Sequence, residues 1–242
     1  MGAAVNRMAQ GLVLTLLGGA VLRVSALSDI YVNYVKPGFR PLLVAAGLVI
    51  LLLGVLGVAK EWRRPYPAKD AGQDGHGHGP WVAWLLCLPV IAIFLISPPP
   101  LGSYAAEREQ TPPPRPTPAG EYAALTPGTA TAMPLGEFIG RAWGDPRQSL
   151  RDRPVKLVGF VVPSKKKGQW YLTRMQLRCC AADAFPLKVA VLGAAAPRAD
   201  TWVEVTGTWV PTPYDRLPKG TVAPEMKATR VAKVSQPGEP YE

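Results

Sequence analysis

Histidine is scarce in this sequence: the 242 residues contain two, and both lie in one short loop, at His76 and His78. The C-terminal half therefore offers no histidine base to a cysteine nucleophile, which excludes the usual Cys–His catalytic arrangement there. It also cannot complete a tetrahedral zinc site by itself, so a closed site of that kind would require a partner chain. Cysteine is scarce too: three residues, with Cys87 inside an apolar run, do not make a disulfide framework.

Acidic residues are outnumbered, because 17 Asp and Glu stand against 27 Lys and Arg, for a formal net charge of +10. Such an excess can indicate nucleic-acid binding. In a membrane protein, the same excess sets topology and holds anionic lipid head groups. Long apolar runs in residues 1–97 favour the membrane explanation, with membrane lipids as partners and no nucleic acid.

Residues 1–97 predict a membrane anchor with three transmembrane helices, at 11–27, 42–59 and 81–96. The first run contains a single charge, Arg23, and a secretory signal peptide is its alternative interpretation. The second run has no charge and is long enough to cross about 27 Å of hydrocarbon. The third run is shorter and contains Pro89, so we expect a short, kinked span, with a re-entrant segment as the alternative.

The basic residues around these runs favour a cytoplasmic N-terminus. Arg7 precedes the first run, and four basic residues follow the second: Lys60, Arg63, Arg64 and Lys69. Three spans would then place the C-terminal domain outside the cytoplasm, in a multi-pass protein of the cell membrane. Two spans would reverse the side on which that domain lies.

Two polar connections follow the second apolar run. The loop at 70–80 contains His76-Gly-His78, a pair that can share a metal ion, although a glycine-rich loop also suits a plain flexible connection. Residues 98–130 form a linker rich in proline and threonine, which favours extended polyproline conformations and cannot form a core. We expect it to act as a semi-rigid spacer between the bilayer and the C-terminal domain.

Residues 131–242 predict a small all-β domain with a short helix at 135–143 and an irregular tail. Alternating or continuous apolar runs indicate five strands, at 155–162, 170–180, 187–191, 203–209 and 231–234. Five strands and one helix in about 100 residues fit a five-stranded, partly closed barrel of the oligonucleotide/oligosaccharide-binding (OB) type. A β-sandwich fragment is the alternative. The predicted fold class is therefore an α-helical membrane part followed by an OB-like β domain.

The adjacent residues Cys179 and Cys180 stand at the end of the second predicted strand. In a regular strand their side chains would point to opposite faces and could not bind one ion together. A bend at 181–183 would remove that obstacle, and Asp183 would then be a third ligand or a turn cap. Three interpretations stay open: Cys179 in the core with Cys180 incidental, a site for a thiophilic ion or metalloid, and redox chemistry.

Two further properties of the cysteine pair follow from its neighbours. A disulfide between adjacent residues is disfavoured, because their Cα atoms lie about 3.8 Å apart and disulfides usually need at least about 4.4 Å. Arg174 and Arg178 fall on the strand face of Cys180, where they would lower its pKa and favour the thiolate.

The chain resembles the YcgQ-like family of two-component permease subunits. Four segments carry the resemblance: 179–183 (CCAAD), 159–161 (GFV), 100–103 (PLGS) and the loop of His76 and His78. The similarity implies a membrane subunit that works beside a separate polytopic permease. Related permeases are associated with metal or metalloid export, which implies a thiophilic substrate.

We therefore expect an accessory subunit of a permease complex rather than an enzyme, with the C-terminal domain gating or binding the substrate. The binding residues we expect are Cys179, Cys180, Asp183 and Arg178, and the candidate metal ligands are Cys179, Cys180, His76 and His78. A thiophilic metal ion is the cofactor considered. The alternative is a membrane-tethered thiol redox or metal-binding protein that acts without a permease.

Overall fold

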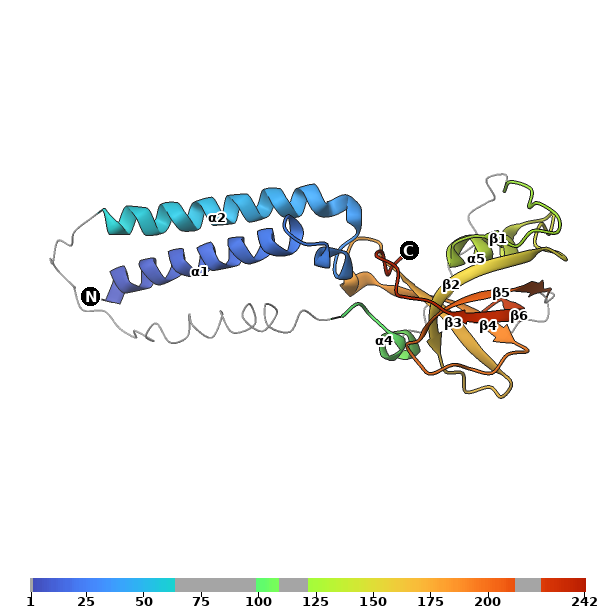
Figure 1. Ribbon diagram of the computed structural model, residues 1–242. Helices are drawn as coiled ribbons and strands as arrows, with labels where there is room; N and C mark the ends of the chain where they lie inside the picture. The colour runs from blue at the N-terminus through green and yellow to red at the C-terminus, as the bar shows by residue number, and fades with distance from the viewer. Residues whose placement is uncertain (1, 64–98, 109–121, 212–222) are drawn as a thin grey trace. The chain divides into compact units, whose positions relative to one another are not determined.

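The computed structural model describes residues 2–63, 99–108, 122–211 and 223–242 (Figure 1). The chain divides into two compact units, Met1–Pro99 and Pro100–Glu242, and each is described by itself. The third predicted span at 81–96, the histidines His76 and His78, and residues 109–121 of the predicted linker lie outside the described residues.

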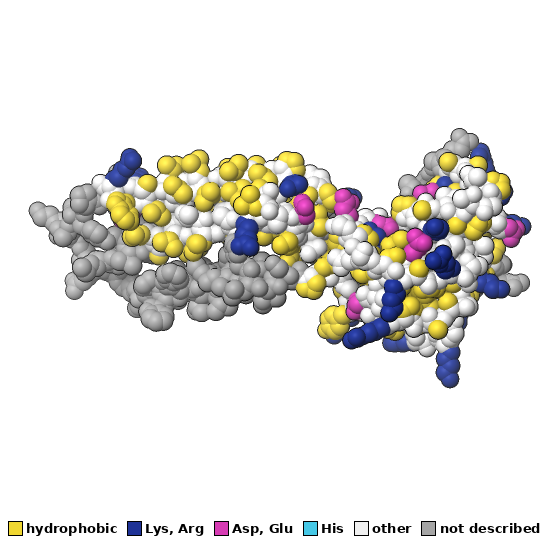
Figure 2. Space-filling model, in the orientation of Figure 1, with side chains coloured by type: hydrophobic (Ala, Val, Ile, Leu, Met, Phe, Trp, Pro, Cys, Tyr) yellow, Lys and Arg dark blue, Asp and Glu magenta, His cyan; other side chains and the backbone are white. Residues whose placement is uncertain are grey.

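Two long helices make up the first unit. α1 (Gly2–Ser25) and α2 (Arg40–Trp62) form an antiparallel hairpin, joined through the short 3-10 turns η1 (Ile30–Asn33) and η2 (Pro37–Phe39). Both helices are long and apolar enough to cross a membrane, judged by length and composition. Their surfaces expose large apolar side chains, as Figure 2 shows: Met8, Leu12, Leu14, Leu16, Leu42, Leu48, Val49, Leu52, Leu53, Val55 and Leu56. Such surfaces suit contact with lipid better than with water.

Glycines allow the two helices to pack closely. A Cβ atom at Gly54 would lie 2.5 Å from the backbone nitrogen of Thr15, and one at Gly18 would meet the backbone of Leu51. Small residues at such contacts are typical of helix pairs in membranes, where association depends on close packing. At the turn, Arg40 donates a 2.9 Å hydrogen bond from Nε to the carbonyl oxygen of Ser25, near the last turn of α1.

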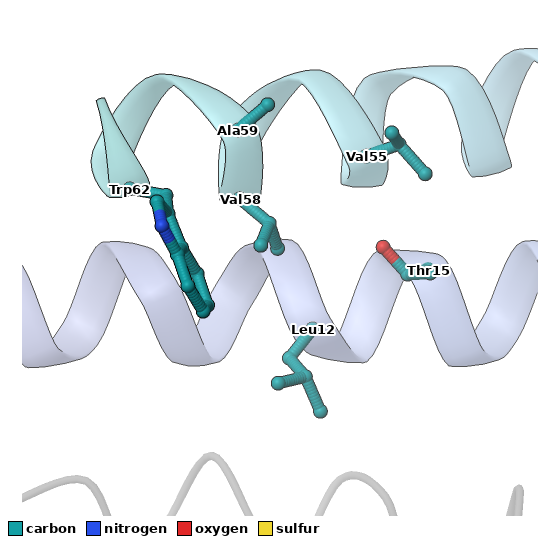
Figure 3. A pocket seen from close by; sticks show the side chains of 6 residues that line it. All are labelled: Leu12, Thr15, Val55, Val58, Ala59 and Trp62. Atoms are coloured by element: carbon teal, nitrogen blue, oxygen red, sulfur yellow. The ribbon is translucent and has the colours of Figure 1, made fainter.

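A shallow apolar hollow of about 360 Å³ lies between the ends of these helices (Figure 3). Its lining is Leu12, Thr15, Val55, Val58, Ala59 and Trp62. Of its labelled side chains, Thr15 and Trp62 carry a polar atom, and the Thr15 hydroxyl donates to the carbonyl oxygen of Gly11. The hollow therefore offers packing space but no charged group.

The second unit is a closed five-stranded barrel. Its strands are β2 (Pro154–Val162), β3 (Gln169–Gln176), β4 (Phe185–Leu192), β5 (Trp202–Val210) and β6 (Glu225–Lys233). They pair in the order β2–β3–β4–β6–β5, and β5 closes the circle by pairing with β2; all pairs are antiparallel except β4–β6. The predicted fold class is confirmed, and the β-sandwich alternative is wrong.

Two local features shape the barrel. The turn between β2 and β3 ends at Gly168, which adopts a φ of 80°, a conformation that glycine accepts without strain. The β5–β6 ladder shifts register between Thr206 and Gly207, where a Cβ would collide with the carbonyl oxygen of Lys227. A glycine at a bulge is a usual device for bending a barrel strand.

The main core fills the barrel from both the strands and a helix that precedes them. α5 (Leu135–Gly144) lies close to the predicted bounds and buries Leu135, Phe138 and Ile139 against the inward side chains of the strands. Just before α5 in the chain, the two-residue strand β1 (Thr131–Ala132) pairs in parallel with β2. The helix thus contributes to the same apolar core as the barrel.

A second cluster covers the outer side of β2 and β3. Along β2, Val155, Leu157 and Val161 face the main core, whereas Phe160 and Val162 join Met175 of β3 in this second cluster. The short helix α4 (Ser103–Arg108) contributes Ala106, which is fully buried, so the expectation that the predicted linker forms no core is wrong for this segment. Its N-terminus is held by Asp200, whose carboxylate accepts 2.6 and 2.7 Å hydrogen bonds from the backbone N–H and hydroxyl of Ser103.

Candidate metal-binding site

The two cysteines lie on the loop at 177–184, called the cysteine loop below, and not on a strand. β3 was expected to run through Cys180, but its ladder with β4 ends at the pair Gln176–Phe185. Beyond that point the backbone N–H of Leu177 donates to the carbonyl oxygen of Glu242 at 3.1 Å. A 3-10 turn, η3 (Ala181–Asp183), then leads the chain into β4, at the place where a bend was considered. The strand boundary was therefore wrong, and the bend removes the obstacle to joint ligation.

The carboxylate of Asp183 organises the loop from within. Its Oδ1 accepts a 2.9 Å hydrogen bond from the backbone N–H of Arg178, and its Oδ2 accepts one of 2.9 Å from that of Cys179. These two N–H groups are thereby satisfied without a strand partner, which explains why the β3–β4 ladder stops. The backbone N–H of Asp183 donates in turn to the carbonyl oxygen of Cys180 at 3.1 Å. Such turns are typical of aspartate.

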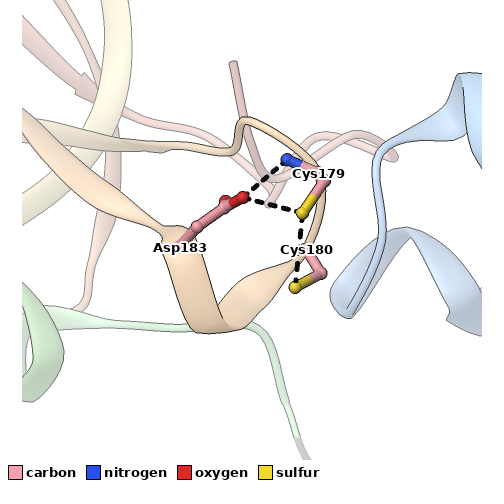
Figure 4. Close-up of side chains that lie close together, drawn as sticks. All are labelled: Cys179, Cys180 and Asp183. Atoms are coloured by element: carbon pink, nitrogen blue, oxygen red, sulfur yellow. Dashed lines mark hydrogen bonds between the residues drawn. The ribbon is translucent and has the colours of Figure 1, made fainter.

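Both thiols lie beside this carboxylate (Figure 4). The Sγ atom of Cys179 donates to Oδ2 of Asp183 at 2.8 Å and lies 3.7 Å from the Sγ atom of Cys180. One ligand atom from each of the three residues can be chosen so that all lie within 4.8 Å of one another. Cys179 is exposed and Cys180 half-buried, and both are free thiols. The interpretation of Cys179 as a core residue is therefore wrong.

The hydrogen bond between the Cys179 thiol and the Asp183 carboxylate shifts the pKa values of both groups. It raises the pKa of Cys179 to about 11, with a further contribution from the neighbouring Cys180 thiol. The same bond lowers the pKa of Asp183; desolvation opposes it, and the backbone N–H groups of the loop add to the lowering. At neutral pH the site therefore holds an ionised carboxylate and a protonated Cys179 thiol. A metal ion must displace that proton before the sulfur can bind it.

The two arginines that were expected to act on Cys180 make other contacts. The guanidinium of Arg178 lies 5.7 Å from the centre of the Phe185 ring. That of Arg174 is buried, lies 5.3 Å from the centre of the Trp202 ring, and donates to the carbonyl oxygens of Glu239 and Tyr241 at 2.8 and 3.0 Å. Arg178 contributes to the loop through its backbone N–H, whereas Arg174 anchors another segment.

That segment is the C-terminal segment, residues 239–242, which sequence reasoning treated as part of an irregular tail. Tyr241 forms an isolated parallel bridge with Met175, and the N–H of Glu242 donates to the carbonyl oxygen of Met175 at 2.9 Å. The Tyr241 hydroxyl accepts a 2.9 Å hydrogen bond from the N–H of Leu101. The C-terminal segment thus fixes the end of β3 from which the cysteine loop departs. Its four residues carry no apolar period that could have predicted this.

Two sulfurs and one carboxylate form a donor set suited to a thiophilic metal ion. Thiolates exclude ions that prefer oxygen alone, and a carboxylate oxygen can add a third bond. Because Cys179 is exposed, an ion there would be open to exchange with solvent or with a partner. The candidate ligands His76 and His78 lie outside the described residues.

Comparison with known protein families gives a match, and it covers the barrel. Residues 146–242 match the family model described as the DUF1980 C-terminal domain. This part of the chain is similar to DUF1980 C-terminal domains. The match begins after α5 and includes the five barrel strands, the cysteine loop and the C-terminal segment. It supports a DUF1980-type family for the barrel and leaves the relation to a permease as a proposal.

Two other comparisons add little about function. None of the curated proteins matches this chain. Among solved structures, a Leishmania major Friedlin protein assigned as an aspartyl-tRNA synthetase aligns with 16% identity over 48% of this chain and 23% of its own, with a TM-score of 0.26. At that level the likeness carries no argument about this chain.

Proposed function

We propose that this protein is an accessory subunit of a membrane permease complex, in which the barrel binds a thiophilic metal ion or metalloid on behalf of the permease. The observation that carries the proposal is the placement of Cys179, Cys180 and Asp183 within 4.8 Å of one another on an exposed loop. A site of this kind can take up an ion and release it again, as a delivery or gating subunit must.

The helical hairpin supports a membrane location for the first unit. From Met8 onward, α1 and α2 expose apolar side chains, so lipid or another membrane protein would cover them favourably. In this proposal the hairpin belongs to a multi-pass anchor in the cell membrane, and the barrel works on the outer side of that membrane.

The packing of the hairpin favours an accessory role over transport by this chain alone. Within the described residues, the helices meet through Gly18 and Gly54, and the hollow between their ends is lined by apolar side chains and Thr15. A metal ion crossing a bilayer needs polar or charged groups along its route. We therefore assign the transport path to a separate polytopic subunit.

The barrel surface argues against nucleic acid as a partner. OB domains bind oligonucleotides on an exposed strand face. Here the outer side of β2 and β3 is covered by α4 and the C-terminal segment, which bury Phe160, Val162 and Met175. Nucleic-acid binding would require both segments to leave this face.

The free thiols favour one alternative, a membrane-tethered thiol redox or metal-binding protein that acts without a permease. The metal-binding form of this alternative uses the same three residues. Its redox form is disfavoured because Asp183 holds the Cys179 thiol in its protonated state and because adjacent cysteines form strained disulfides.

Affinity purification of the full chain from native membranes in mild detergent tests the proposal. We expect a polytopic permease to copurify in defined stoichiometry, and we expect the double variant Cys179→Ser/Cys180→Ser to keep that association while losing metal transport or resistance. Cys87→Ser, which removes the remaining cysteine, is the matched control and should behave like the unaltered chain. Recovery of no polytopic partner, or full function of the double variant, would refute the proposal.

A further inference from the structure

The geometry of the cysteine loop indicates which class of metal ion it would bind. We propose that Cys179, Cys180 and Asp183 bind a borderline divalent ion of the Zn²⁺, Co²⁺ or Cd²⁺ class in tetrahedral geometry, and that the fourth position stays open for an exchangeable ligand. This inference rests on the proposed function, because it specifies the substrate class of the same site.

The donor types narrow the choice of ion first. Two thiolates disfavour Mg²⁺ and Ca²⁺, which prefer sets of oxygen ligands. The carboxylate of Asp183 is a hard donor and adds little to the binding of Cu(I), which prefers sulfur alone. Zinc accepts both sulfur and carboxylate oxygen in one site, and cobalt and cadmium bind similar mixed sets.

The distance between the two sulfur atoms narrows the choice of ion further. The two Sγ atoms lie 3.7 Å apart. With metal–sulfur bonds of about 2.3 Å, a tetrahedral angle places two sulfurs about 3.8 Å apart, whereas a linear two-coordinate ion would need about 4.6 Å. The loop therefore holds its sulfurs at a tetrahedral separation. A linear ion would have to force the side chains of adjacent residues apart.

The carboxylate needs only a small movement to join the sulfurs. Its Oδ2 lies 2.8 Å from Sγ of Cys179 while they share a proton. In a tetrahedral site with a metal–oxygen bond of about 2.1 Å, the same two atoms would lie about 3.6 Å apart. Oδ1 can keep its hydrogen bond from the N–H of Arg178 while Oδ2 turns to the metal. Binding of one divalent ion then releases the two thiol protons to solvent and leaves a site of net charge −1.

The fourth position is open within the part of the chain that the structure describes. The cluster there consists of three ligand residues, and no fourth histidine, cysteine, aspartate or glutamate joins them. Three protein ligands with one open position are the arrangement of zinc sites that exchange a ligand, whereas structural zinc sites are closed by four. Water fills the position in the isolated chain, and a donor from the permease can replace it.

Titration of the purified, reduced, full-length chain in detergent with Co²⁺ tests this assignment. We expect one ion per chain, with intense visible bands of tetrahedral cobalt and a near-ultraviolet band from sulfur-to-metal charge transfer. Stoichiometric Zn²⁺ should abolish both. Cys179→Ser and Cys180→Ser should each reduce the charge-transfer band by about half and weaken binding by more than about tenfold. Asp183→Asn should weaken binding by about tenfold and keep both sulfur contributions.

Three control variants make the result decisive. Cys87→Ser and Asp152→Asn, which change a cysteine outside the loop and an exposed carboxylate elsewhere on the barrel, should leave the titration unchanged. The double variant His76→Ala/His78→Ala should also keep the cobalt spectrum. Loss of the spectrum in that variant would show that histidines occupy the fourth position, and would overturn the open site.

Two outcomes would overturn the choice of ion. One is stoichiometric binding of Cu(I) that Zn²⁺ in excess does not displace, together with no tetrahedral cobalt spectrum. The other is six-coordinate cobalt with weak bands that persist in the double variant Cys179→Ser/Cys180→Ser. Failure of the proposed function is separate: a chain that binds cobalt as expected but copurifies with no permease keeps this inference and loses the accessory role.

Discussion

The thiol of Cys179 donates a 2.8 Å hydrogen bond to the carboxylate of Asp183, and this bond defines the resting state of the cysteine loop. It keeps one sulfur protonated and one carboxylate ionised while both remain accessible. In the proposed metal-bound form of the loop, this thiol proton would have left Cys179.

Removing the acceptor should make Cys179 more reactive. In Asp183→Ala the pKa of Cys179 should fall from about 11 towards that of an ordinary exposed thiol. Because nucleophilicity falls as the pKa falls, the net gain in alkylation rate at pH 8 should be about tenfold. Mass spectrometry of chains pulsed with iodoacetamide measures the rate at each cysteine. An unchanged rate at Cys179 would show that the carboxylate does not hold its proton.

The unaltered chain should show the same effect as a pH profile. A raised folded-state pKa means that the folded loop binds the Cys179 proton more tightly than the unfolded chain does. This contribution to stability is present below the unfolded-state pKa and is lost as the pH rises towards about 11. The alkylation rate of Cys179 should therefore keep rising up to about that pH. A plateau at the ordinary thiol pKa would contradict the assignment.

Loss of the buried arginine should detach the C-terminal segment. Arg174→Met leaves the carbonyl oxygens of Glu239 and Tyr241 without their donor, which should cost about 2–3 kcal/mol of unfolding free energy. The matched variant Arg178→Met removes an exposed guanidinium and should cost less than about 1 kcal/mol. Denaturant titration measures both. Hydrogen exchange should also show lost protection at the N–H groups of Leu177 and Glu242 in the first variant only.

The side chain of Glu242 should stabilise the start of α5. Its two carboxylate oxygens accept 2.9 Å hydrogen bonds from the N–H groups of Leu135 and Gly136, where the helix dipole also favours a negative charge. Glu242→Gln should lower the unfolding free energy by about 1 kcal/mol. Glu239→Gln makes the same change on an exposed side chain of the same segment. Equal effects of the two variants in denaturant titration would contradict the contact.

The substitution Gly54→Ala tests how closely the two helices of the hairpin pack. Gly54→Ala places a Cβ against the backbone of Thr15 and should lower the melting temperature in detergent by several degrees, although alanine is the better helix former. At Gly19 a Cβ would meet no atom within 4 Å, so Gly19→Ala should be neutral or stabilising. Equal melting temperatures for the two variants would mean that α1 and α2 do not pack as described.

Much of the fold could be predicted because it follows from local patterns. The charge-free run at 42–59 and the alternation in β4 and β5 both correspond to elements at nearly the expected bounds. Alternation indicates a strand buried on one face, and a continuous apolar run indicates an element that is apolar on all sides; both can be read from the sequence. The pairing that closes the barrel, between β2 and β5, joins strands distant in the sequence and was not predicted.

The cysteine loop could be located from the sequence, but its geometry could not be predicted. The sequence singled out Cys179, Cys180 and Asp183 and allowed a bend at 181–183, which is present as η3, yet strand alternation extended β3 too far. The strand ends because the Asp183 carboxylate takes two N–H groups from the ladder, a competition that periodicity does not reveal. The C-terminal segment was missed because its backbone, held by Arg174, makes the contacts that fix β3. Backbone pairing across about 65 residues leaves no local signal.

The role proposed for the cysteine loop is to serve metal transport in the membrane. Its most direct test is the metal content of native cells that carry Cys179→Ser/Cys180→Ser on the chromosome, measured by elemental analysis under zinc, cadmium and cobalt loading and compared with Cys87→Ser cells. Our account predicts that the double variant alters metal content as deletion of the whole chain does, while Cys87→Ser cells match the unaltered strain. Equal metal content in the double variant and the unaltered strain, when deletion changes it, would contradict the account.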